Sequence, residues 1–97
     1  MSKIEKIKEI IRKNKGLLAE EYNVSSIGIF GSYVRHQQKK GSDLDVLVEF
    51  ERPIDLFEFI RLEEYLKRLV KVKVDLVSKK ALKPFIGKHI LGEVMYI

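Results

Sequence analysis

The chain has 97 residues, with 19 lysines and arginines against 14 aspartates and glutamates, a formal net charge of +5 and no cysteine. This length fits one domain over residues 1–97, and the lack of cysteine excludes disulfides and thiolate zinc sites and suits a reducing cytoplasm. No apolar run approaches membrane-spanning length, and without an aromatic platform for stacking bases the basic surface does not favour direct nucleic-acid binding. We therefore expect a soluble, cytoplasmic protein without a membrane partner.

The first third of the chain predicts helix followed by strand. Apolar residues recur at helical spacing, so this segment should cover one face of a sheet. The apolar stripe comprises Ile4, Ile7, Ile10, Ile11, Leu17, Leu18 and Tyr22. Residues 24–30 then predict a strand that ends at Gly31-Ser32, where residues 33–38 can begin a short helix.

The Gly31-Ser32 turn has the features of a phosphate-binding turn. A glycine lets the backbone approach a ligand closely, a helix N-terminus offers unpaired N–H groups, and Ser32 adds a hydroxyl. Arg35, one turn further on, could reach the same anion. On its own, however, a Gly-Ser pair after a strand is more often only a turn.

Two aspartates stand at the start of the next predicted strand, residues 43–50. Side chains two residues apart point to the same face of a strand, so Asp43 and Asp45 should lie roughly 6.5 Å apart along it. Two carboxylates that close repel each other unless cations neutralise them, and hard oxygen ligands favour Mg²⁺ or Mn²⁺. The pair could equally belong to a solvated turn that leads into a strand.

A second predicted strand, residues 72–77, carries a third aspartate. Alternation places Asp75 on the face opposite to Val74 and Leu76, which should point into the core. If this strand neighbours the one that carries Asp45, the three aspartates meet and can hold two metal ions.

The remaining segments read as scaffold. Asp55, with Glu58 three residues on, predicts a helix N-cap. Pro84 should begin or interrupt a last helical piece, from residue 85 to about 91, before a short strand at 94–97. The helix after Asp55 is expected to bury Leu56, Phe59, Ile60, Leu66 and Leu69.

Three further polar residues stay outside the candidate site. His36 and His89 are isolated histidines, which are more often surface or packing residues than ligands. Glu49 shares the strand face of the aspartate pair but lies roughly 13 Å beyond Asp45 by strand rise.

Together these segments resemble the minimal (MNT-type) nucleotidyltransferases of the polymerase-β-like superfamily. The resemblance covers nearly the whole chain and rests on Gly31-Ser32-Tyr33-Val34-Arg35, Gly41-Ser42-Asp43-Leu44-Asp45-Val46-Leu47-Val48, Val74-Asp75-Leu76-Val77 and the ending Ile90-Leu91-Gly92-Glu93-Val94-Met95-Tyr96-Ile97. It implies an α/β (α+β) nucleotidyltransferase fold with a mixed β-sheet flanked by helices. It also implies transfer of a nucleoside monophosphate from ATP with release of pyrophosphate.

The resemblance assigns roles to individual residues. Asp43 and Asp45 would ligate two Mg²⁺ ions, with Mn²⁺ as a substitute, and Asp75 would ligate the catalytic ion and help to deprotonate the attacking hydroxyl. The implied nucleotide- and phosphate-binding residues are Gly31, Ser32, Arg35 and Ser42. Two positions depart from the family pattern, since Val34 and His36 stand where alanine and glycine are common. Both are expected to alter the start of the helix and what crowds the phosphates.

Members of this family are commonly the antitoxin half of a prokaryotic toxin–antitoxin pair, and some attach AMP to a tyrosine of a helical HEPN-family ribonuclease toxin. The resemblance therefore implies ATP and a cognate HEPN-family toxin as partners. Two alternatives stay open: an antitoxin that neutralises its toxin by binding alone, and nucleotidyl transfer to a small molecule such as an aminoglycoside. The three aspartates count against the first, and a short chain that lacks walls for a small substrate counts against the second.

Overall fold

A four-stranded mixed sheet forms the centre of the protein. The computed structural model describes residues 2–82 and 84–97. The strands are β1 (Val24–Phe30), β2 (Leu44–Phe50), β3 (Val74–Ser78) and β4 (Met95–Tyr96). Their order is β3-β2-β1-β4, with β1 antiparallel to both of its neighbours and β2 parallel to β3. This confirms the predicted mixed sheet, and the pairing of β2 with β3 meets the condition under which the aspartates were expected to lie together.

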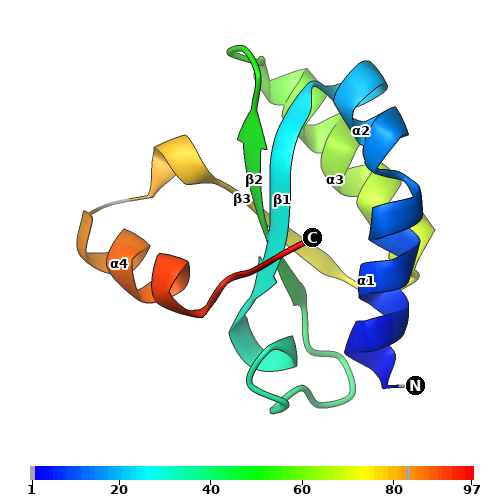
Figure 1. Ribbon diagram of the computed structural model, residues 1–97, viewed down its shortest axis with the longest axis vertical. Helices are drawn as coiled ribbons and strands as arrows, with labels where there is room; N and C mark the ends of the chain where they lie inside the picture. Colours follow the sequence, from blue (N-terminus) through cyan, green and yellow to red (C-terminus); the bar gives the residue numbers. More distant parts are fainter. Residues whose placement is uncertain (1, 83) are drawn as a thin grey trace.

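Helices cover the two faces of the sheet unequally. The helices are α1 (Lys3–Lys13), α2 (Lys15–Tyr22), α3 (Leu56–Val70) and α4 (Pro84–Glu93). Figure 1 shows the first three on one side of the sheet and α4 on the other. Successive side chains of β2 point to opposite faces of the sheet, so this strand contributes to the core on both sides. Val46 and Val48 pack in the larger core with α1 and α3, whereas Leu47 packs with Ile90 of α4 in a smaller cluster.

Local signals explain where the helices begin. The hydroxyl of Ser2 accepts a hydrogen bond from the Glu5 N–H at the start of α1, and the carboxylate of Asp55 accepts one of 2.8 Å from the Glu58 N–H at the start of α3. The N-cap prediction for Asp55 is therefore confirmed. The parallel strands β2 and β3 need a crossover connection, and α3 supplies it.

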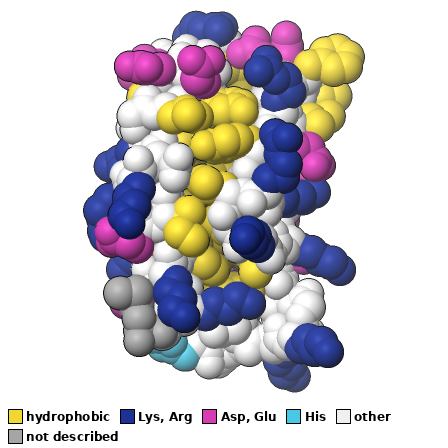
Figure 2. All heavy atoms as spheres, turned by 90° about the vertical axis from the view of Figure 1, so that its right-hand side faces the viewer, with side chains coloured by type: hydrophobic (Ala, Val, Ile, Leu, Met, Phe, Trp, Pro, Cys, Tyr) yellow, Lys and Arg dark blue, Asp and Glu magenta, His cyan; other side chains and the backbone are white. Residues whose placement is uncertain are grey.

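The predicted buried stripe of α3 is partly wrong. Leu66 is fully buried as expected, but Leu56 is 68% exposed and Ile60 is 45% exposed, and the helix instead buries Leu62 and Val70. Apolar residues occupy more than one side of this helix, so spacing alone does not determine which side faces the core. In the N-terminal stripe, Leu17 is likewise exposed. Figure 2 shows the outer surface of this helical layer, where a band of apolar side chains runs between lysine and arginine side chains.

None of the helices within residues 2–82 and 84–97 is both long enough and apolar enough to cross a membrane. The predicted last helix and terminal strand are both present, as α4 and β4.

Candidate active site

Two of the three predicted metal ligands are direct neighbours in the sheet. Asp45 of β2 and Asp75 of β3 are register partners in the parallel pair, so their side chains leave the same face of adjacent strands, roughly 4.8 Å apart. Asp43 precedes β2, which begins at Leu44 rather than at the predicted residue 43, and its side chain is exposed. The sheet therefore brings Asp45 and Asp75 together, and Asp43 lies in the loop before β2, close enough to Asp45 to influence its pKa.

The electrostatics of Asp45 show that this neighbourhood is crowded with negative charge. Burial, followed by the nearby carboxylates of Asp75 and Asp43, raises the pKa of Asp45 from an ordinary 3.8 to about 6, and Arg35 partly opposes this rise. Glu93 adds a smaller contribution in the same direction as the aspartates. A cation placed among these carboxylates would relieve the repulsion.

The donor set fits Mg²⁺ or Mn²⁺ in chemistry, because carboxylate oxygens are the ligands that hard cations prefer. Within the described part of the chain, no three acidic, histidine or cysteine side chains lie close enough together to enclose a metal ion as they stand. Asp43 and Asp75 are both exposed and can turn toward a cation without disturbing the core. Half-buried Asp45 is thus the more fixed member of such a site, and Asp43 and Asp75 are the adjustable ones.

Gly31 brings the phosphate-binding turn against the aspartates. Its φ of +80° lies in the left-handed region, and a Cβ at this position would overlap the Asp45 carboxylate. The predicted short helix at residues 33–38 is wrong: a single 3₁₀ turn spans Gly31–Tyr33, and no α-helix follows before β2. The turn still leaves the Ser32 and Tyr33 N–H groups without a hydrogen bond to any described residue.

The end of this turn accounts for one departure from the family pattern. His36 has a φ of +57°, which glycine adopts readily and other residues adopt at a cost. The resemblance described from the sequence implied glycine at this position, and glycine fits a left-handed backbone. The left-handed residue lies within the segment where the helix was expected, and no α-helix forms there.

A carboxylate that the sequence did not indicate completes the site. The last residue of α4, Glu93, accepts a hydrogen bond of 2.9 Å from the Gly31 N–H and two of 3.0 and 2.9 Å from Nη1 of Arg35. Burial alone would raise the pKa of Glu93, but the Gly31 N–H and the Arg35 guanidinium outweigh it and hold this pKa below its ordinary value. These contacts join residues about 60 positions apart, so no local pattern could have revealed them.

Ser42, the remaining predicted phosphate ligand, bonds within its own loop. Its hydroxyl accepts a hydrogen bond of 2.8 Å from the Lys39 N–H, and its N–H donates to the Lys39 carbonyl oxygen. It also lines a cavity of about 460 Å³ that it shares with Tyr33 and several lysines. These contacts do not link Ser42 to Gly31 or to the aspartates.

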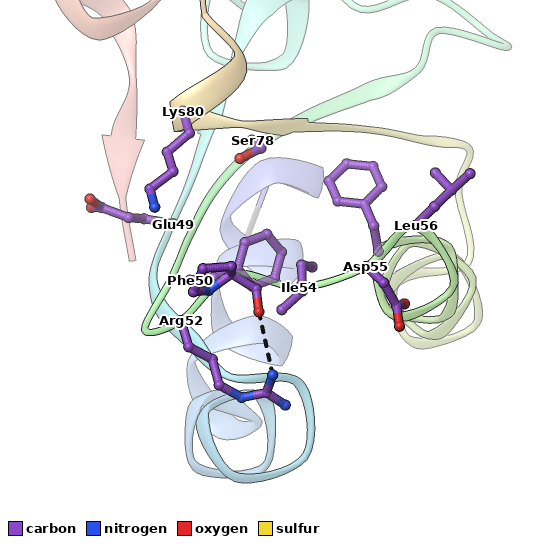
Figure 3. A pocket seen from close by; sticks show the side chains of 10 residues that line it. Glu49, Phe50, Arg52, Ile54, Asp55, Leu56, Ser78 and Lys80 are labelled. Carbon is purple, nitrogen blue, oxygen red and sulfur yellow. Dashed lines mark hydrogen bonds between the residues drawn. The ribbon is translucent and has the colours of Figure 1, made fainter.

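A second, more apolar cavity of about 430 Å³ lies at the opposite end of β2. Figure 3 shows Phe50 and Ile54 in its middle, with the charged Glu49, Arg52 and Lys80 toward the left. None of the predicted site residues lines it, so we place the chemistry at the aspartates, where the charges converge, and not in this cavity. Of the three aspartates, Asp43 and Asp75 are exposed and Asp45 is half-buried.

Comparison with known proteins agrees with this geometry. A family model described as "Nucleotidyltransferase domain" matches residues 4–97. The chain belongs to the nucleotidyltransferase family. It is accordingly an enzyme of the nucleotidyltransferase class with the fold of its family.

Individual relatives of this nucleotidyltransferase match along its whole length. It is 47% identical over 97 residues to "Protein adenylyltransferase MntA" of Thermococcus cleftensis, covering 100% of this chain and 98% of the relative. It is 49% identical over 98 residues to MJ0128 of Methanocaldococcus jannaschii, named as a candidate protein adenylyltransferase, with 100% of both chains covered.

Solved structures share the fold. A candidate minimal nucleotidyltransferase superposes with a TM-score of 0.75 at 30% identity, covering 92% of this chain and 93% of the other. The structure of a "tri-AMPylated Shewanella oneidensis HEPN toxin in complex with MNT antitoxin" superposes with a TM-score of 0.66 at 18% identity, covering 98% of this chain and 71% of the other. At that identity the second match speaks for the fold alone.

Proposed function

We propose that this nucleotidyltransferase moves AMP from ATP to a hydroxyl group of a partner protein, namely a tyrosine of a cognate helical HEPN-family toxin, and so acts as an antitoxin. The observation that most supports it is the pairing of Asp45 with Asp75 beside the Gly31-Ser32 turn. The names of the relatives and of the structural neighbour add support for protein adenylylation and for a HEPN-family partner.

The residues divide into two groups. Asp43, Asp45 and Asp75 would hold two Mg²⁺ ions, which when bound make the attacking hydroxyl easier to ionise and neutralise charge on the triphosphate. Ser32 contributes its hydroxyl and N–H to the phosphate oxygens, and Arg35 contributes a guanidinium that compensates for their charge.

The chemical step is an in-line displacement at the α-phosphorus of ATP. A bond forms between the acceptor oxygen and phosphorus, the bond to the bridging oxygen breaks, and pyrophosphate leaves. Asp75 stands at the outer edge of the sheet, exposed to solvent, and is the aspartate best placed to meet the acceptor hydroxyl and help remove its proton.

We infer that a partner protein supplies the acceptor hydroxyl. We also infer that residues 1–97 form one catalytic domain, and two of its three aspartates, Asp43 and Asp75, are exposed to solvent. A flexible segment of a partner can reach these exposed side chains. Tyrosine suits the role because its phenol, with a pKa of about 10, ionises far more readily than an alkyl hydroxyl.

Intact-mass spectrometry of the toxin tests this function. The protein, its cognate helical toxin, ATP and Mg²⁺ are incubated together, and we expect the toxin to gain mass in units of AMP and to lose ribonuclease activity. Asp45→Asn should abolish the gain. Glu49→Gln is the matched control. Glu49 lies at the other end of the same strand, where one of its carboxylate oxygens is 3.7 Å from Nζ of Lys79.

A toxin that gains no mass, yet is fully neutralised by the Asp43→Asn protein, would show that inhibition occurs by binding alone. Transfer by Asp45→Asn within a few-fold of wild type would contradict the assignment of the metal ligands.

A further inference from the structure

We propose that Glu93 is a positioning residue for nucleotide binding: its carboxylate fixes the Gly31-Ser32 turn and the Arg35 side chain in the arrangement that receives the triphosphate. The inference rests on the proposed function of the site. It adds a residue of the C-terminal helix α4 to a site otherwise drawn from the turn after β1, the loop before β2, and the strands β2 and β3.

The contacts of Glu93 converge on the two groups nearest to the phosphate-binding turn. One oxygen, Oε1, accepts from both the Gly31 N–H and Nη1 of Arg35, and the other, Oε2, accepts from Nη1 alone. Hydrogen bonds between charged groups are about twice as strong as neutral ones, so this is a firm link between the turn and α4. The Glu93 side chain is only 18% exposed, which limits competition from water.

Arg35 needs this link because little else holds it. It follows the 3₁₀ turn in an irregular segment, and its side chain is 44% exposed. Among the described residues, its one other side-chain hydrogen bond runs from Nε to the side chain of Gln37, only two residues further along the chain, at 3.2 Å. A long side chain held only by a neighbour in sequence loses much rotamer entropy when a ligand fixes it. Glu93 removes most of that freedom before the nucleotide arrives.

The link leaves the phosphate-facing donors available. Glu93 uses Nη1 of Arg35 and the Gly31 N–H, while Nη2 of Arg35 and the hydroxyl of Ser32 donate to no described residue. A carboxylate behind a guanidinium orients the remaining N–H groups toward an incoming anion. Glu93 therefore acts through Arg35 and the turn and need not touch the nucleotide.

Calorimetric titration of the full chain with AMP-PNP and Mg²⁺ tests the proposal without any acceptor protein. We expect Glu93→Gln to raise the dissociation constant about tenfold. The neutral amide keeps an acceptor for the Gly31 N–H but loses the charge pairing with Arg35. Glu9→Gln is the control: it removes an equally short ion pair with Arg12, 2.7 Å long, on an exposed face of α1, and should leave the affinity unchanged.

A double substitution separates positioning from general stability. If Glu93 acts through Arg35, then Glu93→Gln should weaken binding less than threefold further in a chain that already carries Arg35→Ala. Glu93→Asp keeps the charge but shortens the side chain, so it should fall between wild type and Glu93→Gln. It is also the variant to measure should Glu93→Gln fail to fold.

Three results would overturn the inference. An unchanged affinity in Glu93→Gln would mean that the link is only structural, and a tighter affinity would mean that the carboxylate competes with the triphosphate. Full additivity with Arg35→Ala would mean that the two residues act separately. If the wild-type protein itself binds no nucleotide, the proposed function fails together with this inference. If the wild type binds and Glu93→Gln binds equally well, the inference alone fails.

Discussion

Replacing Asp45 with asparagine should stabilise the protein without metal, although it should destroy nucleotide transfer. Burial and the neighbouring Asp75 and Asp43 carboxylates raise the pKa of Asp45 to about 6, from an ordinary 3.8. A carboxyl group whose pKa is raised in the folded state binds its proton more tightly there than in the unfolded chain. The contribution of Asp45 to stability is therefore most favourable below about pH 4 and is lost as the pH rises through about 6.

The size of the effect follows from the shift. A difference of about two pKa units corresponds to about 3 kcal/mol, and partial exposure of the Asp45 side chain to solvent reduces this to about 1–2 kcal/mol. Asparagine has nearly the same shape and no charge, so Asp45→Asn should recover this amount at pH 7.5 and almost none at pH 4. For a protein of this size, 1–2 kcal/mol corresponds to a rise in melting temperature of roughly 4–16 °C.

Urea unfolding followed by circular dichroism at pH 4, 5, 6 and 7.5, with divalent cations chelated, measures the free energy of unfolding of both proteins. The difference between variant and wild type cancels the titration of carboxylates that do not interact with Asp45. Glu49→Gln, on the same strand but away from the aspartates, should show no such pH-dependent gain. If Asp45→Asn gains no more stability at pH 7.5 than at pH 4, the carboxylates do not crowd one another as described.

Three further predictions address other parts of the molecule. Mg²⁺ with AMP-PNP should raise the melting temperature more than either ligand alone, and Ser32→Ala should reduce this rise; a melting curve that millimolar concentrations of both ligands leave unmoved would favour an antitoxin that only binds. His36→Gly should raise the free energy of unfolding by about 0.5–1 kcal/mol in urea titrations, since glycine adopts the φ of +57° without strain; a loss of stability would contradict that backbone conformation. Leu62→Ala should cost about 2–5 kcal/mol by the same measurement and Leu56→Ala less than about 0.5 kcal/mol, and equal costs would mean that the orientation of α3 is misassigned.

Sequence reasoning succeeded where the physical signal is local. Residues 24–30 form β1 as predicted, because an apolar run bounded by a glycine turn leaves few alternatives. The Asp55 N-cap needs only a side-chain oxygen and an N–H three residues on, and both are present. The meeting of Asp45 with Asp75 was conditional on neighbouring strands, and the parallel β2–β3 pair satisfies that condition.

It failed where the outcome depends on distant parts of the chain. The helix expected at residues 33–38 is interrupted by the left-handed His36, a conformation that its residue type does not favour. The helical period of α3 was recognised, but apolar residues on several sides left its rotation undetermined, so Leu56 and Ile60 were wrongly expected to be buried. Glu93 reads in sequence as an ordinary helix end, and only the packing of α4 against the sheet brings it to Arg35.

The contacts that build the candidate site join residues at very different separations along the chain. Gly31 and Asp45 flank one antiparallel strand pair, β1 and β2, whereas Asp75 reaches Asp45 only after the crossover through α3 has closed. Since contacts between distant segments require costly loop closure, the β1–β2 pair that brings Gly31 to Asp45 can assemble early in folding, before Asp75 and Glu93 join it. A nucleotide that needs all of these residues would then slow unfolding while leaving the folding rate nearly unchanged, and so extend the lifetime of the folded protein.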